Sequence, residues 1–212
     1  MSRRAGRARD RLLGAALLAV ALAVVAAWLA TVSHPGASYA PMANMVSDLG
    51  RVTCVLWDGE PICSPRHQVF NATFVACGVV VTLVSVALRR RWGTPLTLAM
   101  TGLGIGLVLL GAFPSDVAKP PHMVGAVLAL PVPGAGMLVS GARPDRPWLG
   151  PYRRLRAWLG ALALAVSTGH LLPTGVPFPR GPAEYVGIVA ILVFLVVEGL
   201  RLTRTRPAAV EG

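Results

Sequence analysis

The sequence is poor in charge, since Asp, Glu, Lys and Arg together make up only 14% of its 212 residues. Soluble globular domains carry about 25% of these residues, so the deficit excludes an ordinary soluble domain. Acidic residues are the scarcer sign, with nine against twenty basic residues, and nineteen of those twenty are arginine. Hydrophobic residues fill 54% of the chain, and its mean hydropathy is +0.63. This composition indicates an integral membrane protein.

The short motifs of common enzyme classes are also absent. The chain has no phosphate-binding loop, no CxxC pair, no HExxH and no GxSxG, so no cofactor-binding residues are assigned. Gly102, Gly104 and Gly106 do not form a dinucleotide-binding turn, because no strand precedes them and they lie within an apolar run. Their spacing predicts close packing between helices instead.

Six stretches are long and apolar enough to cross a bilayer, which takes about 20 mostly apolar residues. No soluble domain, low-complexity tract or clear repeat accompanies them, so we expect residues 1–212 to form a single all-α domain, a polytopic six-helix bundle. Pro131 and Pro133 predict a break in the fourth span, and Pro173 predicts one in the fifth. The spans are residues 12–32, 68–88, 94–113, 121–141, 157–178 and 181–200, with a long outer loop at 33–67.

The arginines predict which way the bundle faces. If both termini and the even-numbered loops share one side, that side holds sixteen of the twenty basic residues and the other side holds four. Basic residues concentrate in cytoplasmic loops, so both termini are expected in the cytoplasm. The net charge is then +12 inside and −1 outside. We therefore expect the inner face to contact anionic lipid headgroups, and no nucleic acid.

Two of the three cysteines lie in the long outer loop. Cys54 and Cys63 flank Asp58-Gly59, which is a turn signal, and an outer location is oxidising. A hairpin closed by a disulfide is expected there, which would stabilise the fold by roughly 2.5–3 kcal/mol; the alternative is two unpaired thiols. A loop of this length also predicts a short interfacial helix or re-entrant turn around residues 41–49. Cys77 is expected to be a packing residue in the second span.

Polar side chains in or beside the membrane are the candidate functional residues, because lipid makes them costly. His170 is expected about 18 Å into a core about 30 Å thick. Asp116 and His122 share the second outer loop, where they could hold a divalent metal such as zinc or act as an acid–base pair. The alternatives are a His170 hydrogen-bonded to a neighbouring helix and ordinary polar loop chemistry for the other two residues.

Ser47 and Asp48 are a further candidate pair, with a helix N-cap as the alternative. Asn71 in the second span is expected to bond helix to helix. Glu184 and Glu198 lie near the two ends of the sixth span, where charge is tolerated. Glu198 precedes Arg201 by one turn, so we expect a paired glutamate that snorkels to the inner surface.

Several short elements, in order along the chain, resemble an uncharacterised bacterial membrane family, domain of unknown function 998 (DUF998). The resemblance covers nearly the whole chain and implies a six-helix bundle in the bacterial inner membrane, with no established activity. The cysteine-containing outer loop departs from the family pattern. The elements are Ser47-Asp48-Leu49-Gly50, Val69-Phe70-Asn71-Ala72, Gly111-Ala112-Phe113-Pro114-Ser115-Asp116, His122 followed by Gly125-Ala126, and Glu184-Tyr185-Val186-Gly187 leading into Leu200-Arg201-Leu202.

Three functions follow from these observations. A non-enzymatic sensor, scaffold or accessory protein is favoured, because it requires nothing of the histidines; a protein partner or a homo-oligomer is left open. The second is an outer-face metal-dependent hydrolase, distantly similar to ceramidase and adiponectin-receptor-like hydrolases, which have seven spans and a final HxxxH pair that this chain lacks. The third is a small-solute or proton-coupled carrier that uses His170 and the broken fourth span. The catalytic candidates are Ser47, Asp48, Asp116, His122 and His170, and the metal candidates among them are Asp116, His122 and His170.

Overall fold

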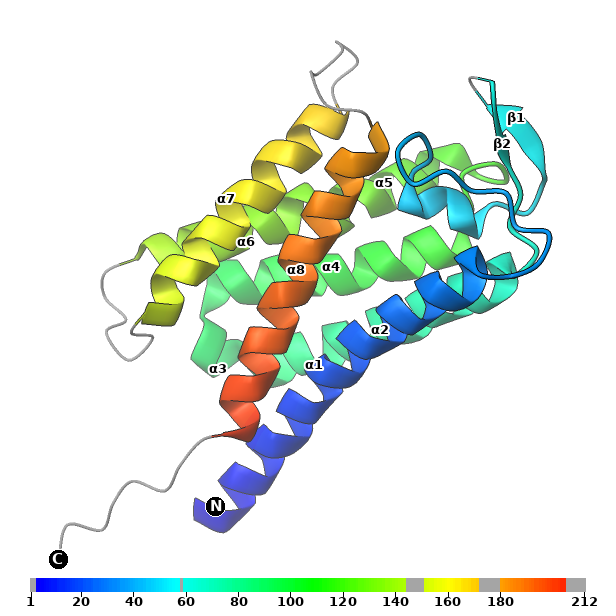
Figure 1. The fold of residues 1–212 in the computed structure, drawn as a ribbon. Helices are drawn as coiled ribbons and strands as arrows, with labels where there is room; N and C mark the ends of the chain where they lie inside the picture. The colour runs from blue at the N-terminus through cyan, green and yellow to red at the C-terminus, as the bar shows by residue number, and fades with distance from the viewer. Residues whose placement is uncertain (1–2, 58, 144–150, 172–179, 205–212) are drawn as a thin grey trace, which may run out of the picture.

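The computed structural model describes residues 3–57, 59–143, 151–171 and 180–204. This part of the chain is mainly helical, as the composition predicts (Figure 1). Its elements are α1 (Arg3–Val32), the 3₁₀ helix η1 (Val46–Gly50), β1 (Val55–Trp57), β2 (Glu60–Ile62), α2 (His67–Ala87), α3 (Arg89–Trp92), α4 (Thr94–Ala112), α5 (Lys119–Ala129), α6 (Pro131–Ala142), α7 (Pro151–Leu171) and α8 (Arg180–Thr203).

Five segments of the described chain are helical, long and apolar enough to cross a membrane. Each overlaps one predicted span, and α5 and α6 together form one of them. The remaining predicted span, residues 157–178, corresponds to α7, which is described only as far as Leu171 and is not among the five. The six-span count therefore stays a prediction. The five segments are Ala5–Val32, His67–Ala87, Thr94–Ala112, Lys119–Ala142 and Gly181–Thr203.

Proline and glycine mark the points where the long helices begin. Pro95, Pro120 and Pro131 lie in the first turns of α4, α5 and α6, where the missing N–H costs no intrahelical hydrogen bond. Gly93, between α3 and α4, has φ +72°, a conformation that favours glycine. The break predicted in the fourth span is confirmed, because α5 ends one residue before Leu130 and α6 begins one residue after it.

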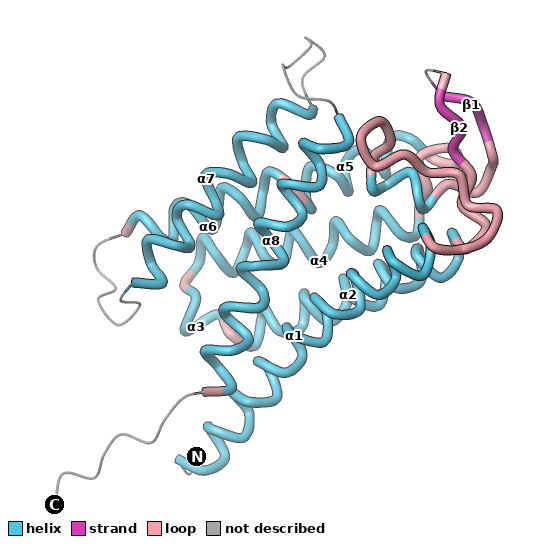
Figure 2. The backbone as a smooth tube through the Cα atoms, in the orientation of Figure 1, coloured by secondary structure: helices cyan, strands magenta, loops and turns pink. Residues whose placement is uncertain are grey.

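The long helices form a closed circuit. Going around it, α1 packs on α2, α2 on α4, α4 on α5 and α6, α6 on α7, α7 on α8, and α8 returns to α1. The closing contact is tight, since a Cβ atom at Gly14 would lie 2.6 Å from the carbonyl oxygen of Gly199. The start of α1 and the end of α8 lie at one end of the bundle, and the loops and the hairpin gather at the other (Figure 2).

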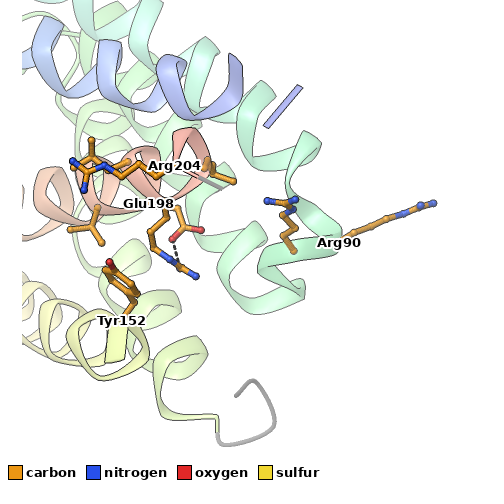
Figure 3. Close-up of a pocket in the computed structure, with 9 residues that line it drawn as sticks. Arg90, Tyr152, Glu198 and Arg204 are labelled. Atoms are coloured by element: carbon orange, nitrogen blue, oxygen red, sulfur yellow. Dashed lines mark hydrogen bonds and ion pairs between the residues drawn. The ribbon is translucent and has the colours of Figure 1, made fainter. Parts of the chain in front are cut away.

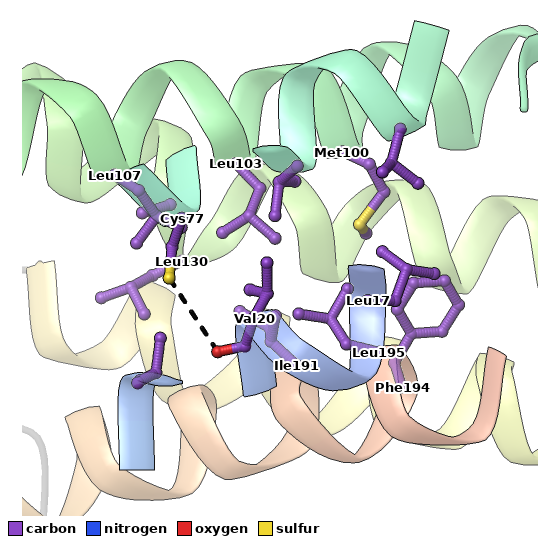
Figure 4. Packing of buried hydrophobic residues seen from close by; sticks show 14 of the residues in the cluster. Leu17, Val20, Cys77, Met100, Leu103, Leu107, Leu130, Ile191, Phe194 and Leu195 are labelled. Atoms are coloured by element: carbon purple, nitrogen blue, oxygen red, sulfur yellow. Dashed lines mark hydrogen bonds between the residues drawn. The ribbon is translucent and has the colours of Figure 1, made fainter. Parts of the chain in front are cut away.

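The interior of the circuit is apolar along most of its length. Leu17 on α1 and Met100 on α4 are completely buried, and α8 contributes Phe194 and Leu195 (Figure 4). Cys77 lies in the same cluster, where its thiol donates to the carbonyl oxygen of Val20 at 4.0 Å. This confirms Cys77 as a packing residue. Polar networks therefore concentrate at the two ends of the bundle.

Candidate functional site at the cap end

Residues 33–66, here called the cap, fold over one end of the bundle. The hairpin pairs β1 with β2 in antiparallel register, with Val55 opposite Ile62. Ser38 and Cys63 exchange two backbone hydrogen bonds of 3.0 and 2.9 Å, which tie the start of the cap to the hairpin. The structure pairs Cys54 with Cys63, as predicted, with their Cα atoms 4.3 Å apart. The short helix expected around residues 41–49 is η1, which begins at Val46.

Asp116 ties the cap to the loop between α4 and α5. Its Oδ2 atom accepts hydrogen bonds from the backbone N–H of Val52 at 3.0 Å, the N–H of Thr53 at 2.8 Å and the Thr53 hydroxyl at 2.7 Å. Burial acts to raise the pKa of this carboxyl, but the Thr53 hydrogen bonds outweigh it and hold the pKa below its usual value. Within the described residues, Oδ1 is buried and has no hydrogen-bond donor. The Oδ2 oxygen of Asp116 is therefore used to bind the cap.

Asp48 holds the first turn of η1. Its Oδ2 accepts the N–H of Met45 at 2.9 Å, and its Oδ1 lies 3.9 Å from the guanidinium of Arg51. The predicted N-cap is wrong in position, because Met45 is the N-cap residue and Asp48 accepts its N–H from the third helical position. Only 3% of Asp48 is exposed, and this burial raises the pKa of its carboxyl.

Glu184, near the start of α8, holds η1 against that helix. It is 6% exposed and accepts the backbone N–H of Val46 at 2.5 Å. The backbone N–H and the hydroxyl of Ser47 also donate to this carboxylate. Sequence reasoning treated Glu184 as a tolerated helix-end charge and missed this role. The one sign of a further role in the sequence is that Glu184 belongs to an element resembling the family pattern. Nothing in the sequence of α8 indicates that η1 would pack against this residue.

His122 closes the turn between α4 and α5. It lies in the first turn of α5, as predicted, is 6% exposed, and places Nδ1 3.0 Å from the carbonyl oxygen of Phe113. The carboxylates of Asp48 and Asp116 and the guanidinium of Arg51 all act electrostatically on this ring. The cap end thus brings three of the predicted site residues into one charged cluster.

The other two predicted residues are Ser47 and His170. Ser47 donates to Glu184. His170 lies in the last turn of α7, and its side chain falls outside the described residues. No three His, Cys, Asp or Glu side chains of the described residues form a group that could hold a metal ion. The metal assigned to Asp116, His122 and His170 therefore stays a prediction.

Further hydrogen bonds join the cap to the helices beneath it. Asn71 on α2 donates to the Gly50 carbonyl at 2.9 Å, which confirms a structural role but in helix-to-cap bonding and not between helices. Within the cap itself, the Ser64 hydroxyl donates to the Leu49 carbonyl at 2.6 Å. The phenols of Tyr39 and Tyr185 hydrogen-bond each other, and burial raises the pKa of Tyr39. The cap is therefore bound to α2 and α8 as well as to the α4–α5 loop.

A small cavity lies beneath η1. Its volume is about 60 Å³, room for only a few water-sized groups, and Ser47 and Glu184 are its polar lining residues. The remaining wall is apolar and includes Phe74, Leu107 and Leu130, the residue at the break between α5 and α6. The cavity can therefore hold a small group against a carboxylate, with apolar surroundings on the other sides.

A second polar network lies at the opposite end of the bundle. Glu198 accepts hydrogen bonds from Trp92 Nε1 at 3.0 Å, from Arg156 at 3.1 Å and from Arg201 at 3.0 Å. The predicted pairing of Glu198 with Arg201 is confirmed. The predicted snorkelling is wrong, because Glu198 is only 7% exposed. It turns inward because donors from α3 and α7 are presented to it there.

Apolar helices of membrane-spanning length, packed around an apolar interior with polar networks at both ends, define a multi-pass helical membrane protein. The chain belongs to the family described as "Protein of unknown function (DUF998)", which it matches over residues 17–201. The matched region runs from α1 to α8, so it includes both polar networks, and the resemblance drawn from the short elements is confirmed. No curated protein and no solved structure matches the chain.

Proposed function

We propose that the protein is a non-enzymatic membrane scaffold or sensor, in which the polar residues at the cap end hold the cap on the bundle. The observation that carries this proposal is the Oδ2 atom of Asp116, which accepts three hydrogen bonds from Val52 and Thr53. A general acid or base has to reach a substrate proton. The carboxylates of Asp48 and Glu184 likewise accept backbone N–H groups at the start of η1. These acids therefore have structural roles.

The same proposal includes the topology. We propose a single domain of six spans in the bacterial inner membrane, with both termini in the cytoplasm and the basic face against anionic headgroups. The distribution of sixteen basic residues against four supports this orientation. The sixth span would be α7, which packs along both α6 and α8 as a member of the circuit.

A second candidate is the metal-dependent hydrolase of the cap end; one observation favours hydrolysis there, and it concerns a serine and not the metal. Ser47 donates its hydroxyl to Glu184 at the edge of an apolar cavity, and a serine beside a base is the arrangement of an activated nucleophile. The carrier rests on His170, whose side chain lies outside the described residues, and no described contact favours it.

Purified protein distinguishes the scaffold from the hydrolase. We expect no stoichiometric metal by elemental mass spectrometry and no labelling of Ser47 by a fluorophosphonate probe. We expect Asp116→Asn to speed amide hydrogen exchange at Val52 and Thr53 about tenfold, because hydrogen bonds to a charged group contribute about 1.5–3 kcal/mol. One metal ion per chain that is lost in His122→Ala, or labelling of Ser47, would overturn the scaffold.

The matched control is Asp10→Asn. Asp10 also bonds a partner distant in sequence, accepting from Arg91 at 2.6 Å, but it does so at the opposite end of the bundle. This variant should leave exchange in the cap unchanged. Faster exchange throughout the cap in both variants would mean general destabilisation and would remove the support that Asp116 gives to the proposal.

A further inference from the structure

A pocket of about 650 Å³ opens at the end of the bundle opposite the cap. Its volume falls in the range of small-ligand sites, about 300–1,000 Å³. Three elements supply its wall: α3, the start of α7 and the end of α8. Figure 3 shows Arg90 across the pocket from Tyr152 and Arg204. The polar residues of the wall are Arg90, Arg91, Tyr152, Glu198, Arg201 and Arg204.

The wall of this pocket is strongly basic. Four arginines and one glutamate line it, so it carries three net positive charges. The single carboxylate does not neutralise it, because Glu198 is shared between Arg201 and the buried Arg156, and it also accepts from Trp92. Arginines therefore outnumber acids around this pocket, and the resulting positive potential attracts an anion.

Two of the wall arginines are held in place by other groups. Arg91 donates to Asp10 at 2.6 Å. Arg201 bonds Glu198, and its guanidinium lies 4.8 Å from the centre of the Tyr152 ring. These contacts fix the shape of the pocket floor.

Arg90 and Arg204 differ from them. Both are exposed, and among the described residues neither forms a salt bridge with an acid. They come from α3 and from the residue just after α8, so they approach the hollow from separate elements. The pocket wall therefore contains two arginines that no acid of the described residues pairs with in a salt bridge.

We propose that this pocket binds a phosphate group, carried by an anionic lipid headgroup or by a small phosphorylated molecule. The planar fork of a guanidinium matches two phosphate oxygens, which favours arginine over lysine for this task. The pocket lies where α2 and α8 leave the apolar core, at the depth where headgroups begin. The proposal does not depend on the role given to the cap. It assigns one defined binding site within an end of the bundle that is basic throughout.

Native mass spectrometry of the full chain in a non-ionic detergent, titrated with dioleoylphosphatidylglycerol, tests the site. We expect Arg90→Gln/Arg204→Gln to weaken binding about tenfold. The matched control is Arg89→Gln/Arg154→Gln, which removes the same charge from two exposed arginines outside the pocket wall. It should weaken binding by less than about twofold. Equal losses in the two double variants would overturn the site, as would no loss in the first.

Two further ligands identify the source of the phosphate. Dioleoylphosphatidylcholine, whose phosphate is neutralised by choline, should bind weakly to all variants. If glycerol 3-phosphate displaces the lipid, and its binding depends on Arg90 and Arg204, the site is supported and its ligand is a soluble phosphate. Failure of glycerol 3-phosphate to compete, with the lipid result as expected, supports it and assigns the headgroup.

Folding is checked by thermal unfolding of each variant in the same detergent. If Arg90→Gln/Arg204→Gln unfolds, Arg90→Lys/Arg204→Lys replaces it, because lysine keeps the charge and loses the fork. The lysine variant should bind more weakly than wild type and more tightly than the glutamine variant. Wild-type affinity in the lysine variant would show that charge alone attracts the lipid and would overturn the assigned geometry.

Discussion

Two acids at the cap end, Asp48 and Asp116, show how the surroundings of a carboxyl decide its charge. Burial raises the pKa of Asp48, whose carboxylate has one backbone donor at 2.9 Å and Arg51 at 3.9 Å. Burial also acts on Asp116, but the N–H and hydroxyl of Thr53 lower its pKa below the usual value. Hydrogen bonds to the charged carboxylate thus outweigh burial at Asp116, whereas burial outweighs them at Asp48.

This contrast predicts an opposite pH dependence for the two acids. A carboxyl with a raised pKa in the folded state binds protons more tightly there than in the unfolded chain, so its contribution to stability falls as pH rises from about 4. We expect Asp48→Asn, which keeps an oxygen for the Met45 N–H, to gain stability relative to wild type as pH rises from about 3 to 7. The measurement is the difference in thermal midpoint between the two proteins across that range.

The same difference cancels most other titrations, because Glu184, Asp116 and His122 titrate in both proteins. Asp116→Asn gives the opposite sign, since a lowered pKa contributes stability above about 4 that is lost as pH falls through the folded value. A thermal midpoint of Asp48→Asn that falls relative to that of wild type as pH rises would contradict the burial argument.

Part of this site was predictable from single residues. Asp48, Asp116 and His122 stand out because an acid or a histidine beside a membrane segment is costly and needs a reason. The partners of these residues were not predictable. Val52 and Thr53 bond Asp116 from more than sixty positions away, and Glu184 bonds Val46 from 138 positions away. Sequence spacing carries no information about such loop-to-helix contacts.

The glycines of α4 allow two neighbouring helices to approach it closely. A Cβ atom at Gly106 would lie 2.7 Å from both the Gly125 carbonyl oxygen and the Ala129 nitrogen of α5. A Cβ atom at Gly104 would lie 2.6 Å from the Gly78 carbonyl oxygen of α2. The predicted packing role of these glycines is therefore confirmed, with Gly104 and Gly106 facing different helices.

Replacing one of these glycines should push two helices apart. We expect Gly106→Ala to destabilise the protein by about 1–3 kcal/mol, because overpacking of the α4–α5 contact outweighs the better helix propensity of alanine. The control is Gly6→Ala on α1, where nothing lies within 4 Å of the added Cβ, and it should leave stability unchanged or slightly raised. Thermal unfolding in detergent measures both, and equal midpoints for the two variants would contradict the packing argument.

The elements themselves were largely predictable, because their causes are local. Apolar runs of spanning length predicted long helices, and the prolines at 131 and 133 predicted the break between α5 and α6. The turn signal Asp58-Gly59 between two cysteines predicted the hairpin and its cysteine pair. The inward turn of Glu198 had no local cause. It depends on Trp92 and Arg156, which lie 106 and 42 positions away.

For the whole molecule, the circuit places the cap at one end and the start of α1 and the end of α8 at the other (Figure 1). With the positive-inside rule, this arrangement predicts which residues face each compartment. Ala8, near the start of α1, and Met42, in the cap, are both exposed and lie at opposite ends.

Cysteine accessibility tests this orientation. In a Cys77→Ala background, we expect Met42→Cys to react with a membrane-impermeant maleimide in intact bacterial spheroplasts. Ala8→Cys should react only after the membrane is permeabilised. The parent Cys77→Ala protein is the control for reaction at Cys54 and Cys63, which are paired in the structure. The reverse pattern of labelling would contradict the orientation.

The network around Glu198 also constrains how the chain can be assembled during synthesis. Trp92 and Arg156 are made 106 and 42 residues before the carboxylate that joins them. At about 5–20 residues per second, seconds pass between translation of the donors and arrival of their acceptor. The contact between Gly14 and Gly199 likewise cannot form until α8 has been translated. The bundle therefore reaches its native packing only once α8 has left the ribosome, after all the other helices have been translated.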